Sequence, residues 1–191
     1  KPIFEKKADY TKGNRFFYLS SIKEMPLKRI LGNLVLSFTT KISSGYWNIF
    51  DPTNGYTAID VSVLKMMDLE SISKRYFFES DMLFKLGIIR AVVMDISMKA
   101  NYPKDNVSSF RLIPNIAKFI WGNIKNTCKR IIYNYYFRDF NIFSVLLLLS
   151  IILLVFGITT GIESWNHSEE SNIPATAGTV MLSSLPIIIG A

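Results

Sequence analysis

Residues 51–56 have side chains that could bind a ligand. They read Asp-Pro-Thr-Asn-Gly-Tyr and follow Ser44-Gly45-Tyr46-Trp47. Asn-Gly is a turn-forming pair that favours positive φ, and the Asp51 carboxylate could cap the turn or contact a ligand. On these residues alone a structural turn is the simpler interpretation, and a binding site is the alternative.

A second segment, Tyr76–Leu83, places two carboxylates among aromatic side chains. Glu79 and Asp81 are two residues apart. At the start of a helix they would interact favourably with the helix dipole. They could instead supply a general base, or a carboxylate that orients an acceptor. The residues leave these two interpretations open.

A third candidate is basic. Gly13-Asn14-Arg15 is followed by Lys28 and Arg29. An arginine guanidinium suits bidentate contact with phosphate. Solvated surface charge is the simpler interpretation of these side chains.

The chain has one cysteine, Cys128, and one histidine, His167. One thiol cannot form an internal disulfide, and one histidine cannot by itself coordinate zinc. The formal net charge is +7, and six basic residues lie shortly before a long apolar run: Arg111, Lys118, Lys125, Lys129, Arg130 and Arg138. This placement favours anionic lipid head groups over nucleic acid as the partner.

The elements that must position these residues alternate between helices and short strands, which predicts an α/β domain. A strand-like piece covers residues 8–17, and residues 44–56 form a loop or an irregular strand. Helices are expected over Met25–Ser43, Val61–Met67 and part of Ser73–Leu86, with a buried strand over Ile88–Met98.

The C-terminal part has a different pattern. After a loop over Asn101–Ser109, Pro114–Tyr136 is amphipathic and rich in lysine and aromatic residues. Such a helix is typical of the membrane interface; packing on the domain core is the alternative. Ile142–Ile162 is uncharged and long enough to cross a hydrocarbon core of about 30 Å. Ile173–Ala191 is also uncharged and predicts a second span.

The flanks of the first span predict its orientation. Basic residues precede it, whereas Glu163–Asn172 contains three Glu and no Lys or Arg. The positive-inside rule then places the N-terminal domain in the cytoplasm and the acidic loop outside. We therefore expect a multi-pass protein of the cell membrane.

In order along the chain, these segments resemble family-2 glycosyltransferases of the GT-A (Rossmann-like) fold. The similarity is greatest to membrane-tethered polyprenyl-phosphate sugar synthases such as dolichyl-phosphate mannose synthase. Five segments contribute to it: Ala8-Asp9-Tyr10 with Gly13-Asn14-Arg15-Phe16, Met25-Pro26 through Arg29 and Asn33, residues 51–56, Phe77–Leu83, and Asp95-Ile96-Ser97-Met98.

The resemblance implies the C-terminal part of such an enzyme. Its divisions would be the C-terminal half of the catalytic domain (1–112), a basic juxtamembrane helix (113–140), a first transmembrane helix (141–163), an external loop (164–172) and a second transmembrane helix (173–191). The family's Asp-x-Asp motif, which binds Mg²⁺ or Mn²⁺, would precede Lys1. The chain alone is therefore expected to transfer no sugar.

The resemblance also implies roles for individual residues: phosphate contacts for Arg15 and Arg29, the sugar and acceptor pocket for Asp51, Asn54 and Gly55, and an acidic pair at the reacting centre for Asp81 with Glu79. Three positions depart from the family pattern. Ser97 stands where Pro is usual, and Asn101 and Pro103 stand where Arg and Gly are often found.

The function implied by the resemblance is transfer of a sugar from a nucleotide-sugar to a membrane acceptor, with a polyprenyl phosphate as the first choice. A lipid-linked or surface glycan as acceptor is one alternative. A non-catalytic membrane subunit with a degenerate transferase domain is another. Nucleic acid is not an expected partner, and self-association is left open.

Overall fold

The computed structural model describes residues 1–18, 22, 25, 27–99 and 112–191, without the side chains of residues 28, 29 and 112–115. The predicted loop over Asn101–Ser109 lies outside the described residues, as do Pro26 and Pro103. The chain divides into two compact units, Lys1–Ile132 and Tyr133–Ala191. They are described separately below.

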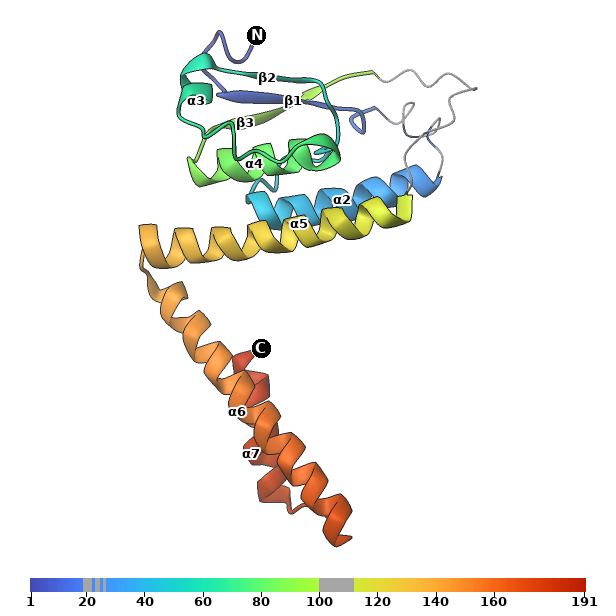
Figure 1. Ribbon diagram of the computed structural model, residues 1–191, viewed down its shortest axis with the longest axis vertical. Helices are drawn as coiled ribbons and strands as arrows, with labels where there is room; N and C mark the ends of the chain where they lie inside the picture. The colour runs from blue at the N-terminus through green and yellow to red at the C-terminus, as the bar shows by residue number, and fades with distance from the viewer. Residues whose placement is uncertain (19–21, 23–24, 26, 100–111) are drawn as a thin grey trace. The chain divides into compact units, whose positions relative to one another are not determined.

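Unit 1 combines helices with a small sheet, which confirms the α/β prediction at that level (Figure 1). The strands are β1 (Tyr10–Asn14), β2 (Thr57–Ile59) and β3 (Val93–Ser97). The helices are α2 (Leu27–Ser44), α3 (Val61–Lys65), α4 (Phe78–Ile88) and α5 (Leu112–Ile132), with a 3₁₀ turn at Arg75–Phe77 before α4.

The sheet has the order β2-β1-β3. Strand β1 is central and buried along its whole length. It pairs antiparallel with β2 and parallel with β3, where Lys12 lies opposite Asp95. Because β1 and β3 are parallel, their carboxyl ends meet at the same edge of the sheet.

The strand predicted over Ile88–Met98 is shorter than expected. Helix α4 continues to Ile88 and ends with Arg90 in the left-handed region at φ 57°. The Ala91 N–H then donates to the Leu86 carbonyl at 3.0 Å, as in a Schellman motif. This helix end uses up residues 88–91, so only Val93–Ser97 joins the sheet.

The apolar core of unit 1 lies between the sheet and α4. Its best buried side chains come from β1, β3, α4 and the loop before β2: Tyr10, Ile49, Leu83, Leu86 and Val93. Helices α2 and α5 lie on the other side of α4 from the sheet (Figure 1). Helix α4 is therefore the middle layer of the unit.

Unit 2 is a helical hairpin. A π-helical turn, Tyr133–Arg138, precedes α6 (Ile142–Ser171) and α7 (Ala177–Gly190). Helix α6 starts with a capping box between Asn141 and Ser144. It packs closely against α7, because a Cβ at Gly157 would lie 2.6 Å from the Ser183 carbonyl oxygen.

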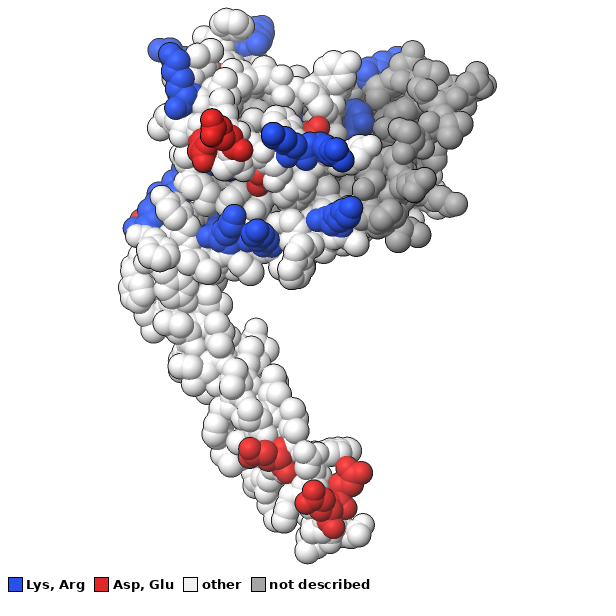
Figure 2. All heavy atoms as spheres, in the orientation of Figure 1, with Lys and Arg blue, Asp and Glu red and all other residues white. Residues whose placement is uncertain are grey.

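Among the described residues, α6 is the one helix long and apolar enough to cross a membrane. The shorter α7 is also apolar. We expected a loop over 164–172, but α6 stays helical through Ser171 and ends at Asn172, which has φ 53°. The acidic side chains thus form the polar end of a helix, which is the red patch at the lower end of Figure 2.

Candidate functional site

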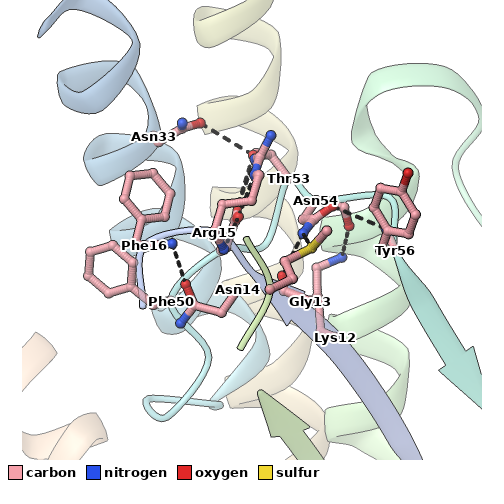
Figure 3. A network of polar contacts seen from close by, with 12 residues as sticks. Lys12, Gly13, Asn14, Arg15, Phe16, Asn33, Phe50, Thr53, Asn54 and Tyr56 are labelled. Atoms are coloured by element: carbon pink, nitrogen blue, oxygen red, sulfur yellow. Dashed lines mark hydrogen bonds and ion pairs between the residues drawn. The ribbon is translucent and has the colours of Figure 1, made fainter. Parts of the chain in front are cut away.

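The candidate site lies where the carboxyl ends of β1 and β3 meet residues 50–56 (Figure 3). The Gly13 N–H donates to the Tyr56 carbonyl at 2.9 Å, and the Asn54 amide donates to the Gly13 carbonyl at 2.8 Å. The Lys12 ammonium donates to the Asn54 carbonyl at 2.8 Å. In open α/β sheets ligands bind outside the carboxyl ends of strands, so this edge is a reasonable place for a site.

The turn at Asn54-Gly55 differs from the one that the sequence predicts. Among the described residues with positive φ, neither Asn54 nor Gly55 appears, so that expectation was wrong. Instead the Asn54 side-chain oxygen accepts the Tyr56 N–H at 3.2 Å. This side-chain turn reverses the chain without a left-handed residue.

Arg15 and Asp51 form a bidentate ion pair. Arg15 Nε and Nη2 lie 2.6 and 2.8 Å from the two Asp51 oxygens, and the Arg15 backbone N–H donates to the same carboxylate at 3.2 Å. The Asp51 side chain is fully buried and that of Arg15 is 15% exposed. The pair fixes the loop before β2 to the end of β1, where Thr53 also accepts from Arg15 at 3.2 Å.

Four of the predicted binding residues therefore come together at this edge: Arg15, Asp51, Asn54 and Gly55. Gly55 is exposed, and a Cβ there would meet no atom within 4 Å. The side chain of Arg29 is outside the described part of α2. Phosphate contact by either arginine stays a prediction.

Sequence reasoning missed two members of the site, Lys12 and Asp95. Lys12 has no exposed surface. The available signal was a lysine inside the strand-like piece predicted over residues 8–17. The Asp95 Oδ2 atom accepts from the Asn14 amide at 2.8 Å and from the Phe50 N–H at 3.1 Å. Its other oxygen is buried and has no hydrogen-bond partner among the described residues.

Burial changes the proton affinity of both groups. Burial lowers the pKa of Lys12 to about 8, against the opposing effect of the Glu79, Asp51 and Asp95 carboxylates. Burial also raises the pKa of Asp95. The site thus contains an amine that can gain or lose a proton near neutral pH, beside carboxylates that balance its charge.

Helix α4 directs the two carboxylates of the predicted acidic pair, Glu79 and Asp81, to different sides. Residues two apart lie about 200° apart around an α-helix, so Glu79 and Asp81 face different ways. Glu79 interacts electrostatically with Lys12, whereas Asp81 accepts from the Ser73 N–H at 2.7 Å and the Asn126 amide at 2.9 Å. The two carboxylates do not form one centre, because the i, i+2 spacing cannot join them.

Both carboxylates lie in the first turn of α4, as a favourable dipole interaction requires. A role for either in catalysis stays a prediction. Within the described ranges, no group of three or more His, Cys, Asp or Glu side chains could hold a metal ion. The expected Mg²⁺ or Mn²⁺, which the resemblance assigns to a motif before Lys1, stays a prediction.

We expect Gly13→Ala to lower the free energy of unfolding by about 1–3 kcal/mol, because the site has no room for a methyl group. A Cβ at Gly13 would lie 2.6 Å from Met98 Sδ and 2.9 Å from Asn54 Nδ2. Gly55→Ala is the matched control and should change stability by less than about 0.5 kcal/mol. Urea unfolding in detergent, followed by tryptophan fluorescence with Trp165→Phe in every protein, would compare them. Equal stability of the two variants would contradict the crowding at Gly13.

Comparisons with known proteins give one partial similarity. A stretch of 75 residues is 36% identical to the UDP-N-acetylglucosamine–dolichyl-phosphate N-acetylglucosaminyltransferase of Methanococcus voltae. The similar stretch covers 39% of this chain and 30% of that protein, so the chain spans under a third of the relative's length. No family model and no solved structure matches the chain significantly.

Proposed function

We propose that this chain is part of a membrane-bound glycosyltransferase that transfers a sugar from a nucleotide-sugar to a polyprenyl phosphate. The observation that carries the proposal is the similarity to the Methanococcus voltae enzyme, whose name specifies both substrates. The finer assignment, a family-2 enzyme with a GT-A fold, rests on the order of the sequence motifs and is part of the same proposal.

The reaction places limits on the chemistry that the protein must supply. The bond between the sugar's anomeric carbon and the nucleotide diphosphate breaks, a phosphate oxygen of the acceptor bonds to that carbon, and a nucleoside diphosphate leaves. The acceptor is already an anion, so a strong base is unnecessary. Side chains that position phosphates and balance charge are sufficient on the acceptor side, and the edge around Arg15 and Lys12 has this character.

Attachment to the membrane fits such an acceptor. The reactive phosphate of a polyprenyl lipid lies at head-group level, and tethering an enzyme there raises the effective concentration of acceptor at its site. Helix α6 is apolar enough to supply the tether.

The proposal is tested with the complete gene product that contains this sequence. Membranes containing it would be given radiolabelled UDP-N-acetylglucosamine, then other nucleotide-sugars, with dolichyl or undecaprenyl phosphate. We expect label in the lipid phase that requires the added polyprenyl phosphate and is lost on chelation with EDTA, as a divalent-metal enzyme predicts. Failure of every donor, or product formed without added polyprenyl phosphate, would contradict the proposed acceptor. In the same assay the 191-residue chain alone is expected to form no product.

We further propose that residues 1–140 face the cytoplasm and that the acidic end of α6 faces outside, because Lys and Arg precede α6 and are absent from its acidic end. A Ser168→Cys variant in a Cys128→Ser background should react with a membrane-impermeant thiol reagent in intact cells. Reaction only after lysis would reverse the orientation.

A further inference from the structure

Among the described side chains of helix α2, most large apolar ones point outward and several small hydroxyl groups point toward the protein. Five of its described apolar residues are exposed and lie within an arc of about 100° on the helix: Leu27, Leu31, Leu34, Val35 and Phe38. Leu27 is 70% exposed and Phe38 is 57% exposed. The opposite side of the helix is buried and mostly polar: Leu36, Ser37, Thr40, Ser43 and Ser44.

Hydrogen bonds to α4 and α5 fix this inverted arrangement. Thr40 shares a hydrogen bond with Ser80 of α4 at 2.9 Å. Ser43 donates to Asn123 of α5 at 2.5 Å. These buried hydroxyl groups have partners, so turning α2 over would leave them unsatisfied. The outward position of the apolar arc is therefore a property of the packed unit.

Helix α5 continues the apolar surface. It runs alongside α2 in the same direction (Figure 1). Asn123 accepts from Ser43, and Arg130 donates to the Ile42 carbonyl at 2.8 Å. Its buried side contains Phe119, Asn123 and Asn126, and its outer side contains Trp121, Ile124 and Cys128. Helix α5 thus packs on the domain and also exposes an apolar face, which combines both interpretations of its amphipathic pattern.

The two outward faces lie on the same side of the unit. Asn126 bonds to Asp81 of α4, and Thr40 of α2 bonds to Ser80 of the same helix. On each helix the exposed apolar side chains lie roughly opposite these contacts, so both faces point away from α4. We call this surface the α2–α5 face: Leu27, Leu31, Leu34, Val35 and Phe38 of α2 with Trp121, Ile124 and Cys128 of α5.

Lysines border the α2–α5 face. Lys118, Lys125 and Lys129 are exposed and follow the edge of α5 beside its apolar residues. Figure 2 shows basic side chains in a row along α5. An exposed apolar surface next to a line of lysines is typical of a helix that lies in an anionic lipid interface.

The chain itself also favours a membrane as the occupant. Only residues 133–141 separate the end of α5 from the start of α6. A short stretch of chain therefore links the C-terminal end of α5 to a helix that is apolar enough to span a bilayer.

We infer that the α2–α5 face lies in the head-group region of an anionic bilayer, so that unit 1 contacts the membrane along the length of α2 and not only where α6 enters it. This inference does not depend on the transfer reaction. A second copy of the chain is the other possible occupant, and the lysines oppose it because two such edges would repel each other.

The test uses the full chain in lipid vesicles, with cysteines placed in a Cys128→Ser background and labelled with the fluorophore NBD. Leu31→Cys and Phe38→Cys report on the α2–α5 face. Met66→Cys, at the end of α3 and 70% exposed, is the control in the same unit. Lipids with a nitroxide near the head group should quench NBD at positions 31 and 38 several-fold more than at position 66. This difference should be larger in vesicles that contain phosphatidylglycerol than in phosphatidylcholine alone.

Leu31 is the decisive position, because it lies toward the N-terminal end of α2, far from Ile42, which contacts Arg130 near the end of α5. Quenching at position 31 equal to that at position 66 would overturn the inference. Blue-shifted NBD emission at position 31 without quenching by lipid nitroxides would also overturn it, because it would place the face against another protein copy. In the variant Lys118→Gln, Lys125→Gln, Lys129→Gln, quenching at position 31 in anionic vesicles should fall to the level in phosphatidylcholine; no change would exclude the anionic head groups as the partner.

Discussion

Replacing Asp51 with alanine is expected to lower the free energy of unfolding of unit 1 by about 3–5 kcal/mol, the cost of removing one partner from a buried ion pair. The carboxylate is fully buried and accepts from Arg15 Nε, Nη2 and backbone N–H. Alanine removes all of these acceptors and leaves the arginine charge in a site where only 15% of its side chain is exposed. The Trp165→Phe background and urea unfolding described above provide the measurement.

A double variant separates the electrostatic contribution of the ion pair to stability from the contribution of side-chain packing. Arg15→Met with Asp51→Leu replaces both charges by apolar groups, which is often close to neutral where a single replacement is not. We expect the double variant to be more stable than Asp51→Ala. Thr53→Val is a milder control, since its hydroxyl makes longer contacts of 3.2 and 3.3 Å with Arg15 and Asn33. If single replacements of Arg15 and Asp51 each lowered the free energy of unfolding by under about 1 kcal/mol, and these effects were additive, the ion pair would contribute little to stability.

Transfer activity should respond in the same direction. Asp51 and Arg15 hold the loop that contains Asn54 and Gly55 against β1. Loss of the ion pair would therefore displace all of these candidate binding residues. If Arg15 instead contacts a phosphate, Asp51→Asn should weaken acceptor binding more than it weakens the fold. Measuring both quantities on one set of variants distinguishes positioning from direct contact.

Several elements could be predicted from the sequence because their periodicity is long and regular. Helix α2 was expected over Met25–Ser43 and is found at Leu27–Ser44, and α6 begins at the predicted Ile142. Strand β2 was not predicted, because three residues are too few to show an alternating pattern. The helical extension over 163–171 was missed because charged residues end a membrane span without ending a helix.

The direction in which a helix faces could not be predicted. The apolar stripe of α2 is clear in the sequence, but helical spacing does not distinguish a face packed on a core from one exposed to lipid. The signal lay on the opposite side of the helix, in the hydroxyl groups of Ser37, Thr40, Ser43 and Ser44. The partners of Thr40 and Ser43, which are Ser80 and Asn123, come from distant parts of the chain, and only folding brings them together.

The candidate site shows the same limit. Residues 13–15 and 51–55 were selected from local motifs, and they do meet. Lys12 and Asp95 were missed, because they become neighbours only through the parallel pairing of β1 with β3. Asp81 and Glu79 were grouped by closeness in sequence, although a helix turns residues at that spacing away from each other.

The second substitution with a large expected effect on stability is at Asp81. Asp81→Ala should lower the free energy of unfolding by about 3 kcal/mol or more, because it removes two charge-assisted hydrogen bonds from a side chain only 5% exposed. These bonds join α4 to the loop at Ser73 and to Asn126 of α5. The residue thus connects three parts of unit 1 whatever its role in transfer.

Asp81→Asn separates a structural role from a catalytic one. Asparagine can accept from the Ser73 N–H with its oxygen and donate to Asn126 with its nitrogen, provided that the Asn126 amide turns over, and that exchange is sterically small. We therefore expect a stability loss of at most about 1 kcal/mol. If the carboxylate also acts in sugar transfer, turnover of the complete gene product should still fall by at least about tenfold, since the charge is gone while the fold remains. The urea unfolding curve and the lipid-phase assay, run on the same preparation, give the two quantities. Normal turnover with an intact fold would leave Asp81 a structural residue. Glu79, whose charge acts on Lys12, would then be the remaining acidic candidate.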